Sequence, residues 1–94
     1  LNITFRNIEI HKSVLYPVAV FVGENSGGLI DNVIFENVRI NGNEQIRIAN
    51  NSKLNGDITN VIFRNCSRNG SPIATYADLN LKLSRIDKKI VSIY

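Results

Sequence analysis

The sequence predicts an all-β protein, and within that class a right-handed parallel β-helix of about three coils. The first observation is a motif, N-[IV]-x-F-x-N, which occurs at Asn2–Asn7, Asn32–Asn37 and Asn60–Asn65 with spacings of 30 and then 28 residues. The second is the abundance of Asn, which occurs fourteen times in 94 residues and recurs at the same places in each repeat. A period of this length is typical of stacked architectures, in which each repeat buries its apolar face against its neighbours.

Each motif predicts two short strands that meet at a bend. In the first copy, apolar residues lie two apart at Ile3 and Phe5 and again at Ile8 and Ile10, and the alternation shifts across Asn7. β-Branched and aromatic residues with this period favour strands, and Asn suits the bend because it tolerates left-handed backbone angles. Stacking of the copies then predicts two ladders, formed by Phe5, Phe35 and Phe63 and by Asn7, Asn37 and Asn65.

A third strand is expected between the motifs. Residues 18–22 and 45–49 are apolar-rich segments, and Gly-rich or Asn-rich turns follow them at 23–28 and 50–56. Three short strands for each repeat, separated by such turns, describe one coil of a parallel β-helix. The chain is expected to form a single domain with coils at about 1–28, 29–57 and 58–94, the last with a terminal cap. A leucine-rich repeat also combines strands with an Asn ladder, but its Leu-dominated spacing is missing here.

The segment 79–93 has two possible structures. Leu79, Leu81 and Leu83 alternate as in a strand, and we expect a final strand at 89–94. The alternative is a capping helix, whose apolar face would contain Leu79, Leu83, Ile86, Ile90 and Ile93.

The third motif departs from the earlier copies at two core positions. Arg68 occupies the position of Ile10 and Ile40. A charged residue there is expected where a stack ends, since terminal repeats need a more polar outer face. Cys66 replaces Val38, and we expect it to be a small buried core residue.

Composition excludes several classes of function. The net charge is +3, but the charged residues are dispersed rather than gathered with aromatic residues on one face, so we expect no nucleic-acid partner. No apolar run approaches the ~20 residues that span a bilayer, so no membrane insertion is expected. A single Cys and a single His give no metal-binding spacing, and no metal or cofactor is expected. Because the chain begins with Leu1 and contains no Met, we expect it to be a processed or truncated piece of a longer protein.

Two stretches resemble the final coils of pectinase-like β-helix proteins, notably polygalacturonase-type and dextranase-like glycoside hydrolases. They are Asn32–Gly42 and Val61–Ile73, and the resemblance covers essentially the whole chain. It implies the C-terminal coils of a secreted, extracellular or periplasmic polysaccharide-degrading enzyme. The implied partners are a polysaccharide or oligosaccharide and the rest of its own β-helix chain, or a homo-oligomer.

The catalytic motifs of that family are incomplete in this sequence. Polygalacturonase-type enzymes are expected to carry N-T-D, D-D, G-H-G and R-I-K. Here His11 has no flanking Gly, there is no Asp-Asp pair, and Arg47-Ile48-Ala49 resembles R-I-K with Ala in place of Lys. The resemblance therefore implies that the catalytic residues lie outside this segment.

Two acidic residues are nevertheless candidates for catalysis. Glycoside hydrolysis needs two carboxyl groups about 5–10 Å apart, and Asp31 and Asp57 precede the second and third motifs at roughly equivalent turns. Coils that stack ~4.8 Å apart would bring them within this range. The alternative is that both are turn residues whose side chains bond to nearby backbone.

A possible sugar-binding platform lies on the strands between the motifs. If Val20 and Ile48 point inward, Phe21 and Arg47 point outward on one face. An aromatic ring beside an Arg is suited to a sugar ring or an acidic sugar, and Tyr16 and Tyr76 flank the same strands. The alternative is that Phe21 packs under a loop and Arg47 is simply solvated.

Three functions remain open at this stage. The first is a structural end of a polysaccharide-degrading enzyme, with one outer sugar subsite. The second is a non-catalytic glycan-binding or tailspike-like adhesion module, and the third is a purely structural solenoid segment. In each case the open first coil is expected to make the isolated chain associate, because an unpaired strand edge invites pairing.

Overall fold

The computed structural model describes residues 2–11 and 15–94, and it confirms the predicted all-β class. Its only helical elements in these ranges are a single-turn helix α1 (Tyr76–Leu79) and a 3₁₀ turn at Lys88–Ile90. The strands are β1 (Ile3–Ile10), β2 (Ala19–Val22), β3 (Leu29–Ile30), β4 (Val33–Ile40), β5 (Ile46–Asn50), β6 (Asp57–Ile58), β7 (Val61–Arg64), β8 (Ser67–Arg68), β9 (Ser71–Pro72), β10 (Leu81–Ser84) and β11 (Val91–Ile93).

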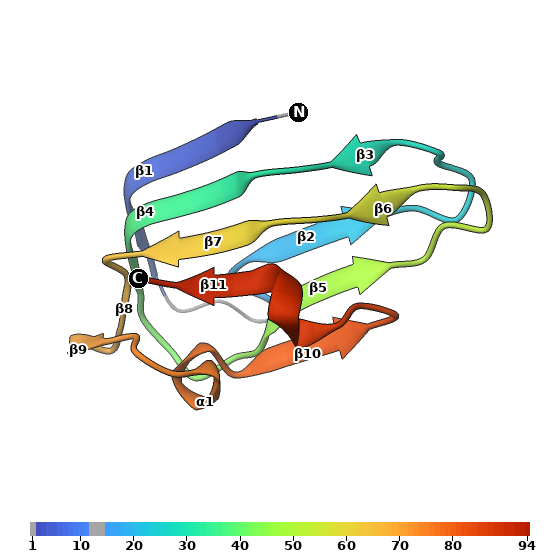
Figure 1. The fold of residues 1–94 in the computed structure, drawn as a ribbon. Coiled ribbons are helices and arrows are strands. Elements are labelled where there is room, and N and C mark those ends of the chain that lie inside the picture. The colour runs from blue at the N-terminus through green and yellow to red at the C-terminus, as the bar shows by residue number, and fades with distance from the viewer. Residues whose placement is uncertain (1, 12–14) are drawn as a thin grey trace.

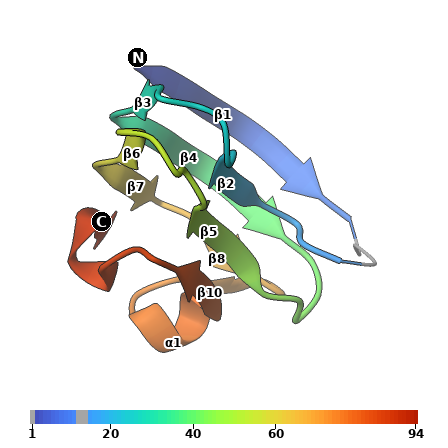
Figure 2. The ribbon, with the colours of Figure 1, turned by 90° about the vertical axis from the view of Figure 1, so that its right-hand side faces the viewer.

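Successive passes of the chain visit three sheets in the same order. The largest sheet contains β1, β4, β7 and β11 and continues through β8 and β9, the second contains β2, β5 and β10, and the third pairs β3 with β6. All pairings between passes are parallel, whereas the short β8–β9 pair is antiparallel, so the largest sheet is mixed. The first two sheets form separate layers, with β1 at one end of the stack and α1 at the other (Figures 1 and 2).

The strand register aligns the repeated motifs. Phe5 is paired with Phe35, and Phe35 with Phe63. Their rings stack at centroid distances of 5.3 and 5.0 Å, with interplanar angles of 11° and 15°. Offset stacking of this kind adds to the burial of the rings. The motif spacing in the sequence therefore corresponds to one step between neighbouring strands.

The motif Asn residues form the bends. Asn7, Asn37 and Asn65 all have left-handed backbone angles, with φ of 57°, 52° and 53°. The Asn37 side-chain nitrogen donates to Asn7 Oδ1 at 2.8 Å, so these two amides form a ladder. At Asn65 the backbone N–H donates to the carbonyl of Tyr94 at 3.1 Å. The bend thus recurs in all three motifs. The side-chain amide bond joins Asn7 and Asn37, whereas the bond of Asn65 to Tyr94 is made by its backbone N–H.

The core fills the space between the layers. In β2 and β4 the inward-facing residues are buried, and they alternate with more exposed neighbours as the period of two requires. The most deeply buried large side chains are Phe63, Ile40, Ile46, Ile48, Ile58, Leu79, Val38, Val61 and Val91. Cys66 is buried among them, and its Sγ donates to the Phe35 carbonyl at 3.2 Å. Burial raises the pKa of this thiol, which favours its neutral, unreactive form.

The segment 79–93 contains two strands, as expected, instead of a capping helix, but Leu79 ends helix α1 and the last strand begins at Val91, after the 3₁₀ turn at Lys88–Ile90. β10 pairs with β5 and β11 pairs with β7, both in parallel. The preceding helix α1 is a single turn capped by Thr75, and the Asp78 carboxylate accepts bonds from the Ala74 and Thr75 amides. These bonds lower the pKa of Asp78.

Within the described residues, no helix is long and apolar enough to cross a membrane.

Arg68 closes the end of the core near α1. It pairs with Ile40 in register, and its guanidinium donates to four backbone carbonyls. Burial lowers the pKa of this group, and the Glu44 carboxylate partly offsets the effect. The acceptors are the carbonyls of Gly42, Glu44, Asp78 and Leu79, at 2.9, 3.1, 2.9 and 2.7 Å. A charged side chain in a core position is thus stabilised by four backbone carbonyls.

Candidate functional site

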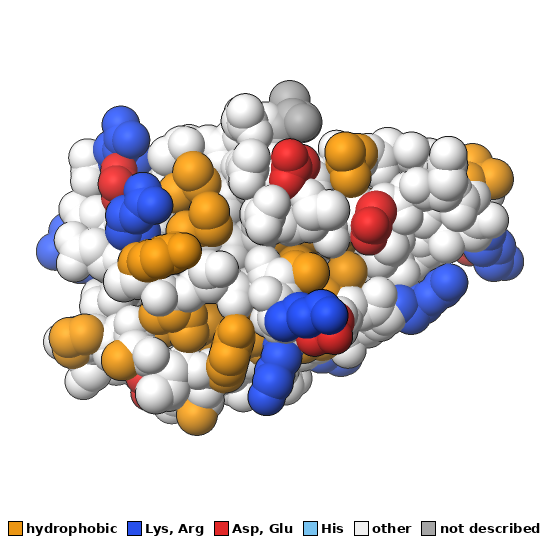
Figure 3. Space-filling view, in the orientation of Figure 1, with side chains coloured by type: hydrophobic (Ala, Val, Ile, Leu, Met, Phe, Trp, Pro, Cys, Tyr) orange, Lys and Arg blue, Asp and Glu red, His pale blue; other side chains and the backbone are white. Residues whose placement is uncertain are grey.

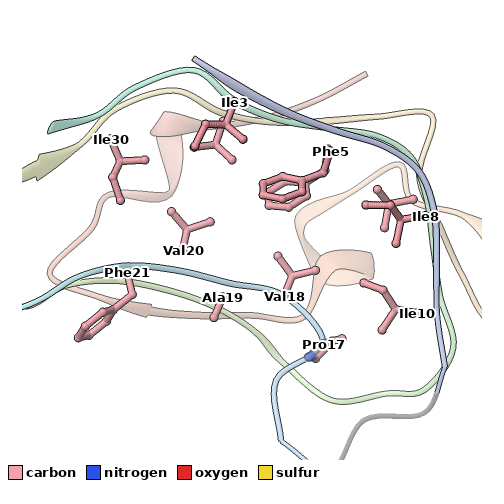
Figure 4. Close-up of a pocket in the computed structure, with 13 residues that line it drawn as sticks. Ile3, Phe5, Ile8, Ile10, Pro17, Val18, Ala19, Val20, Phe21 and Ile30 are labelled. Carbon is pink, nitrogen blue, oxygen red and sulfur yellow. The ribbon is translucent and has the colours of Figure 1, made fainter. Parts of the chain in front are cut away.

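The outer face of the second sheet carries a cluster of two cations and two aromatic rings. Its members, which we call the cationic–aromatic patch, are Tyr16, Phe21, Arg47 and Lys82. Phe21 lies on β2, Arg47 on β5 and Lys82 on β10, so three neighbouring strands contribute one residue each. Figure 4 shows Phe21 pointing to the opposite side of β2 from the inward-facing Val20.

The rings and cations of the patch are in direct contact. The Arg47 guanidinium carbon lies 5.1 Å from the centroid of the Phe21 ring and 5.8 Å from that of Tyr16. The Lys82 Nζ lies 5.6 Å from the Tyr16 centroid and donates to the Tyr16 hydroxyl at 3.0 Å. These are cation–π distances, and they hold the charged groups in defined positions above the sheet.

Positive charge is concentrated in the patch. Arg47 and Lys82 are directly paired across β5 and β10, and like charges in this arrangement repel one another. The hydrogen bond from Lys82, together with the charges of Lys82 and Arg47, lowers the pKa of Tyr16. The four side chains of the patch include no carboxylate that would neutralise these charges. An anion bound from solvent would therefore reduce the repulsion between Arg47 and Lys82.

This combination of groups is suited to binding an acidic sugar. The face of an aromatic ring offers an apolar surface to a sugar ring, and Arg and Lys form charge-assisted hydrogen bonds with carboxylate or sulfate groups. Phe21 is accessible, with a relative exposure of 46% for the residue. The four side chains of the patch include no carboxyl group, whereas glycoside hydrolysis uses a pair of them.

The sequence indicated three of the four patch residues. The structure brings Phe21, Arg47 and Tyr16 together, and it adds Lys82, which the sequence analysis did not single out. The available signal was the alternation of Leu81, Lys82 and Leu83, which places Lys82 outward once the segment is known to pair with β5.

Tyr76, the other candidate for sugar binding, belongs to a different neighbourhood. Its hydroxyl donates to the Val91 carbonyl at 2.8 Å, and the Lys88 Nζ lies 5.4 Å from its ring centroid. The side chain therefore fastens α1 to the last strand. It makes these contacts at the α1 end of the molecule rather than with the patch.

Asp31 is engaged in a turn. Its carboxylate accepts hydrogen bonds from the Thr59 hydroxyl and, at 3.1 Å, from the Asn60 side chain. It also lies 3.5 Å from the side-chain nitrogen of Asn32. These bonds lower the pKa of Asp31. A general acid in glycoside hydrolysis needs the opposite shift, since it must hold its proton near neutral pH.

Asp57 does not occupy the position equivalent to Asp31. The register pairs Asp57 with Leu29 on β3, two residues before Asp31, and Thr59 is the residue bonded to Asp31. The Asp57 carboxylate accepts a bond from the Ile58 amide at 2.8 Å. Both carboxylates thus make the local bonds that are typical of turn residues.

Replacing Asp31 with Asn is expected to flatten the dependence of stability on pH. The native carboxylate has a lowered pKa, so its stabilisation is complete above the unfolded-state value of about 4 and is lost as the pH falls through the native value. Asp31→Asn should therefore differ from the unmodified chain at neutral pH, and the difference should shrink in acid. Urea unfolding at several pH values measures this, with Asp57→Asn as the control. A difference that is constant with pH would contradict the prediction.

No metal centre is evident. Within residues 2–11 and 15–94, no group of three or more His, Cys, Asp or Glu side chains lies close enough to hold a metal ion. On the face seen in Figure 3 some Lys or Arg side chains lie beside Asp or Glu and other charged side chains stand apart, without a continuous field of one sign.

Comparison with protein-family models, curated proteins and solved structures gives no match to this chain.

Proposed function

We propose that this chain forms the last coils of a right-handed parallel β-helix in a secreted, extracellular or periplasmic carbohydrate-active protein, and that its cationic–aromatic patch binds an acidic polysaccharide. One observation carries the binding proposal. Two cations, Arg47 and Lys82, are paired in register on the outer face of the second sheet, where Arg47 lies near the rings of Tyr16 and Phe21 and Lys82 lies near that of Tyr16.

The strand arrangement supports the β-helix part of the proposal. The first two passes of the chain visit the three sheets in one order, and strands of the largest sheet pair in parallel at offsets of 30 and 28 residues. The resemblance of the motifs to the final coils of pectinase-like proteins agrees with this arrangement. The Arg68 closure near α1 is consistent with the end of such a stack.

The role of this segment in the proposal is binding, with any hydrolysis performed by residues elsewhere in a glycoside hydrolase. A glycan-binding or tailspike-like adhesion module is the second candidate. It is favoured by the same patch, which holds cations and rings without an acid pair. An upstream pair of catalytic carboxylates would distinguish the enzyme from the adhesion module.

The binding proposal is tested by titrating the isotope-labelled chain with tetragalacturonate and following backbone amide resonances. We expect shifts confined to β2, β5 and β10, and weaker binding at high salt because charged contacts are screened. Arg47→Ala/Lys82→Ala should weaken binding by about tenfold or more, since it removes both charge-assisted donors.

A variant with the same loss of charge provides the control. Arg39→Ala/Arg64→Ala removes two cations from the largest sheet, and it should leave the tetragalacturonate affinity within about twofold of the unmodified chain. Equal losses for the two double variants would show that only net charge matters and would overturn the assignment to the patch. Equal binding of neutral maltotetraose would overturn the acidic-sugar proposal.

A further inference from the structure

The end of the stack opposite α1 exposes the core. Ile3, Phe5 and Ile8 of β1 have relative exposures of 36%, 42% and 36%. Their register partners on β4, Val33, Phe35 and Val38, have exposures of 4%, 7% and 1%. The exposed side chains border a hollow of about 450 Å³ between the two layers, into which Val18 and Val20 also point (Figure 4).

The outer edge of β1 is unpaired within the described residues. β1 pairs with β4 along one edge, and the sheet order places no described strand on its other edge. An edge of eight residues offers a row of backbone donors and acceptors to a further strand. The geometry of the existing β1–β4 interface, continued by one step, would place a strand there in parallel.

The charged side chains of β1 indicate which charged residues such a strand must have. Along one column of the sheet, Arg6 is paired with Glu36, and Glu36 lies 3.9 Å from Arg64, so the signs alternate. In a second column Glu9 is paired with Arg39. Continuing the alternation places an acid beside Arg6 and a base beside Glu9.

The Asn ladder adds a third requirement. Asn37 donates to Asn7 Oδ1, which leaves the Asn7 side-chain nitrogen without a hydrogen-bond partner among the described residues. The Oδ1 of another Asn, placed one step further, would accept from this nitrogen and repeat the same bond. The neighbouring strand therefore needs an Asn at this column.

We infer that the free edge of β1 is the docking site for one further parallel coil, whose strand has the pattern apolar-x-aromatic-acid-Asn-apolar-base-apolar. This inference rests on the stacking part of the proposed function and is independent of the glycan. The sequence of β4, VIFENVRI, has this pattern, with Glu36 and Arg39 at the charged positions.

A second copy joined head to tail fits this edge less well. The last strand of the chain, β11, is paired with β7 so that Ile93 aligns with Phe63, and the Tyr94 ring lies 5.5 Å from the Arg64 guanidinium. A copy presenting β11 to β1 would set Tyr94 beside Arg6, where the column requires an acid.

The test uses the full chain and a fluorescent synthetic peptide that copies residues 31–43, which contain the β4 pattern. We expect saturable binding in fluorescence anisotropy and slower hydrogen exchange in residues 3–10, with no change in β11. A peptide with the changes Glu36→Arg and Arg39→Glu should bind at least about tenfold more weakly, because both charged columns become repulsive. A peptide with Asn37→Ala should also bind more weakly, through loss of the amide bond to Asn7.

Other results of the same experiment would contradict the inference. No binding, or equal binding of the charge-exchanged peptide, would overturn the inference. If analytical ultracentrifugation shows a dimer that protects residues 3–10 and excludes the peptide, a second copy is the occupant and the inference is also wrong. Titration of the same sample with tetragalacturonate reports the glycan proposal separately, since the patch lies on β2, β5 and β10.

Discussion

Replacing Phe63 with Ala is expected to lower the free energy of unfolding by about 3–5 kcal/mol. Phe63 is 1% exposed, and its ring stacks on Phe35. Truncation therefore removes buried apolar surface and leaves a cavity in the core beside the largest sheet. Total stabilities of small domains are about 5–15 kcal/mol, so this one change removes a large fraction. Urea unfolding followed by circular dichroism measures the loss.

Phe5→Ala is the matched control within the same ladder. The Phe5 ring is 42% exposed and stacks only from one side, on Phe35. Its truncation should cost about 1 kcal/mol, since less apolar surface returns to water. Equal losses at Phe5 and Phe63 would contradict the burial argument. If Phe63→Ala does not fold, Phe63→Leu should give a measurable intermediate loss.

Replacing Arg68 with Met is expected to lower the free energy of unfolding by about 2–4 kcal/mol. Met keeps an unbranched apolar stem but removes every donor, so four backbone carbonyls lose the hydrogen bond from Arg68, and the Gly42 carbonyl keeps only its bond from Asn69. Hydrogen bonds to charged groups contribute about 1.5–3 kcal/mol each, and buried acceptors without partners add a further cost. The expected total is smaller than the sum because the site is only partly buried and water can replace some bonds.

Arg64→Met provides the comparison for Arg68. Arg64 is exposed and has a cation–π contact with Tyr94 and a long ion pair with Glu36. Exposed pairs of this kind contribute about 0–1 kcal/mol, so the same chemical change should have a small effect there. A loss at Arg68 no larger than that at Arg64 would show that the carbonyl bonds do not stabilise the fold.

The repeated part of the fold could be predicted because its signal is local. The alternation around Asn7 and Asn37 predicts strands and a bend, and the common register of Phe5 and Phe35 predicts which residues stack. Both depend only on periods of two within a strand and of about 30 between strands. The structure places these residues accordingly.

The candidate site was less predictable because it depends on how separate segments align. Asp31 and Asp57 were expected at roughly equivalent turns, but they lie one and three residues before their motifs, and β3 and β6 keep the 28-residue offset of those motifs, so Thr59 takes the position equivalent to Asp31. Lys82 joins the patch only because β10 pairs with β5 in one particular register. That register has an offset of 35 residues instead of 28, so the repeat does not encode it.

The short β8–β9 pair, by contrast, has a local signal. After Cys66 the chain turns at Asn69 and Gly70, both with positive φ, and doubles back instead of continuing the bend of the earlier copies. The Asn-Gly step is a strong hairpin-turn signal, and the antiparallel pairing of Arg68 with Ser71 follows from this two-residue turn.

The parallel pairing of successive passes determines how the molecule resists a pulling force along the stacking axis. The hydrogen bonds between passes lie along the stacking axis, so a pulling force along that axis must break them one junction at a time. The junction of β1 with β4 is long and is reinforced by pairing in the two other sheets, whereas β11 is held to the stack by a three-residue pairing with β7. Under tension the C-terminal strand should therefore peel away first, at low force, while the earlier passes remain intact and resist the load.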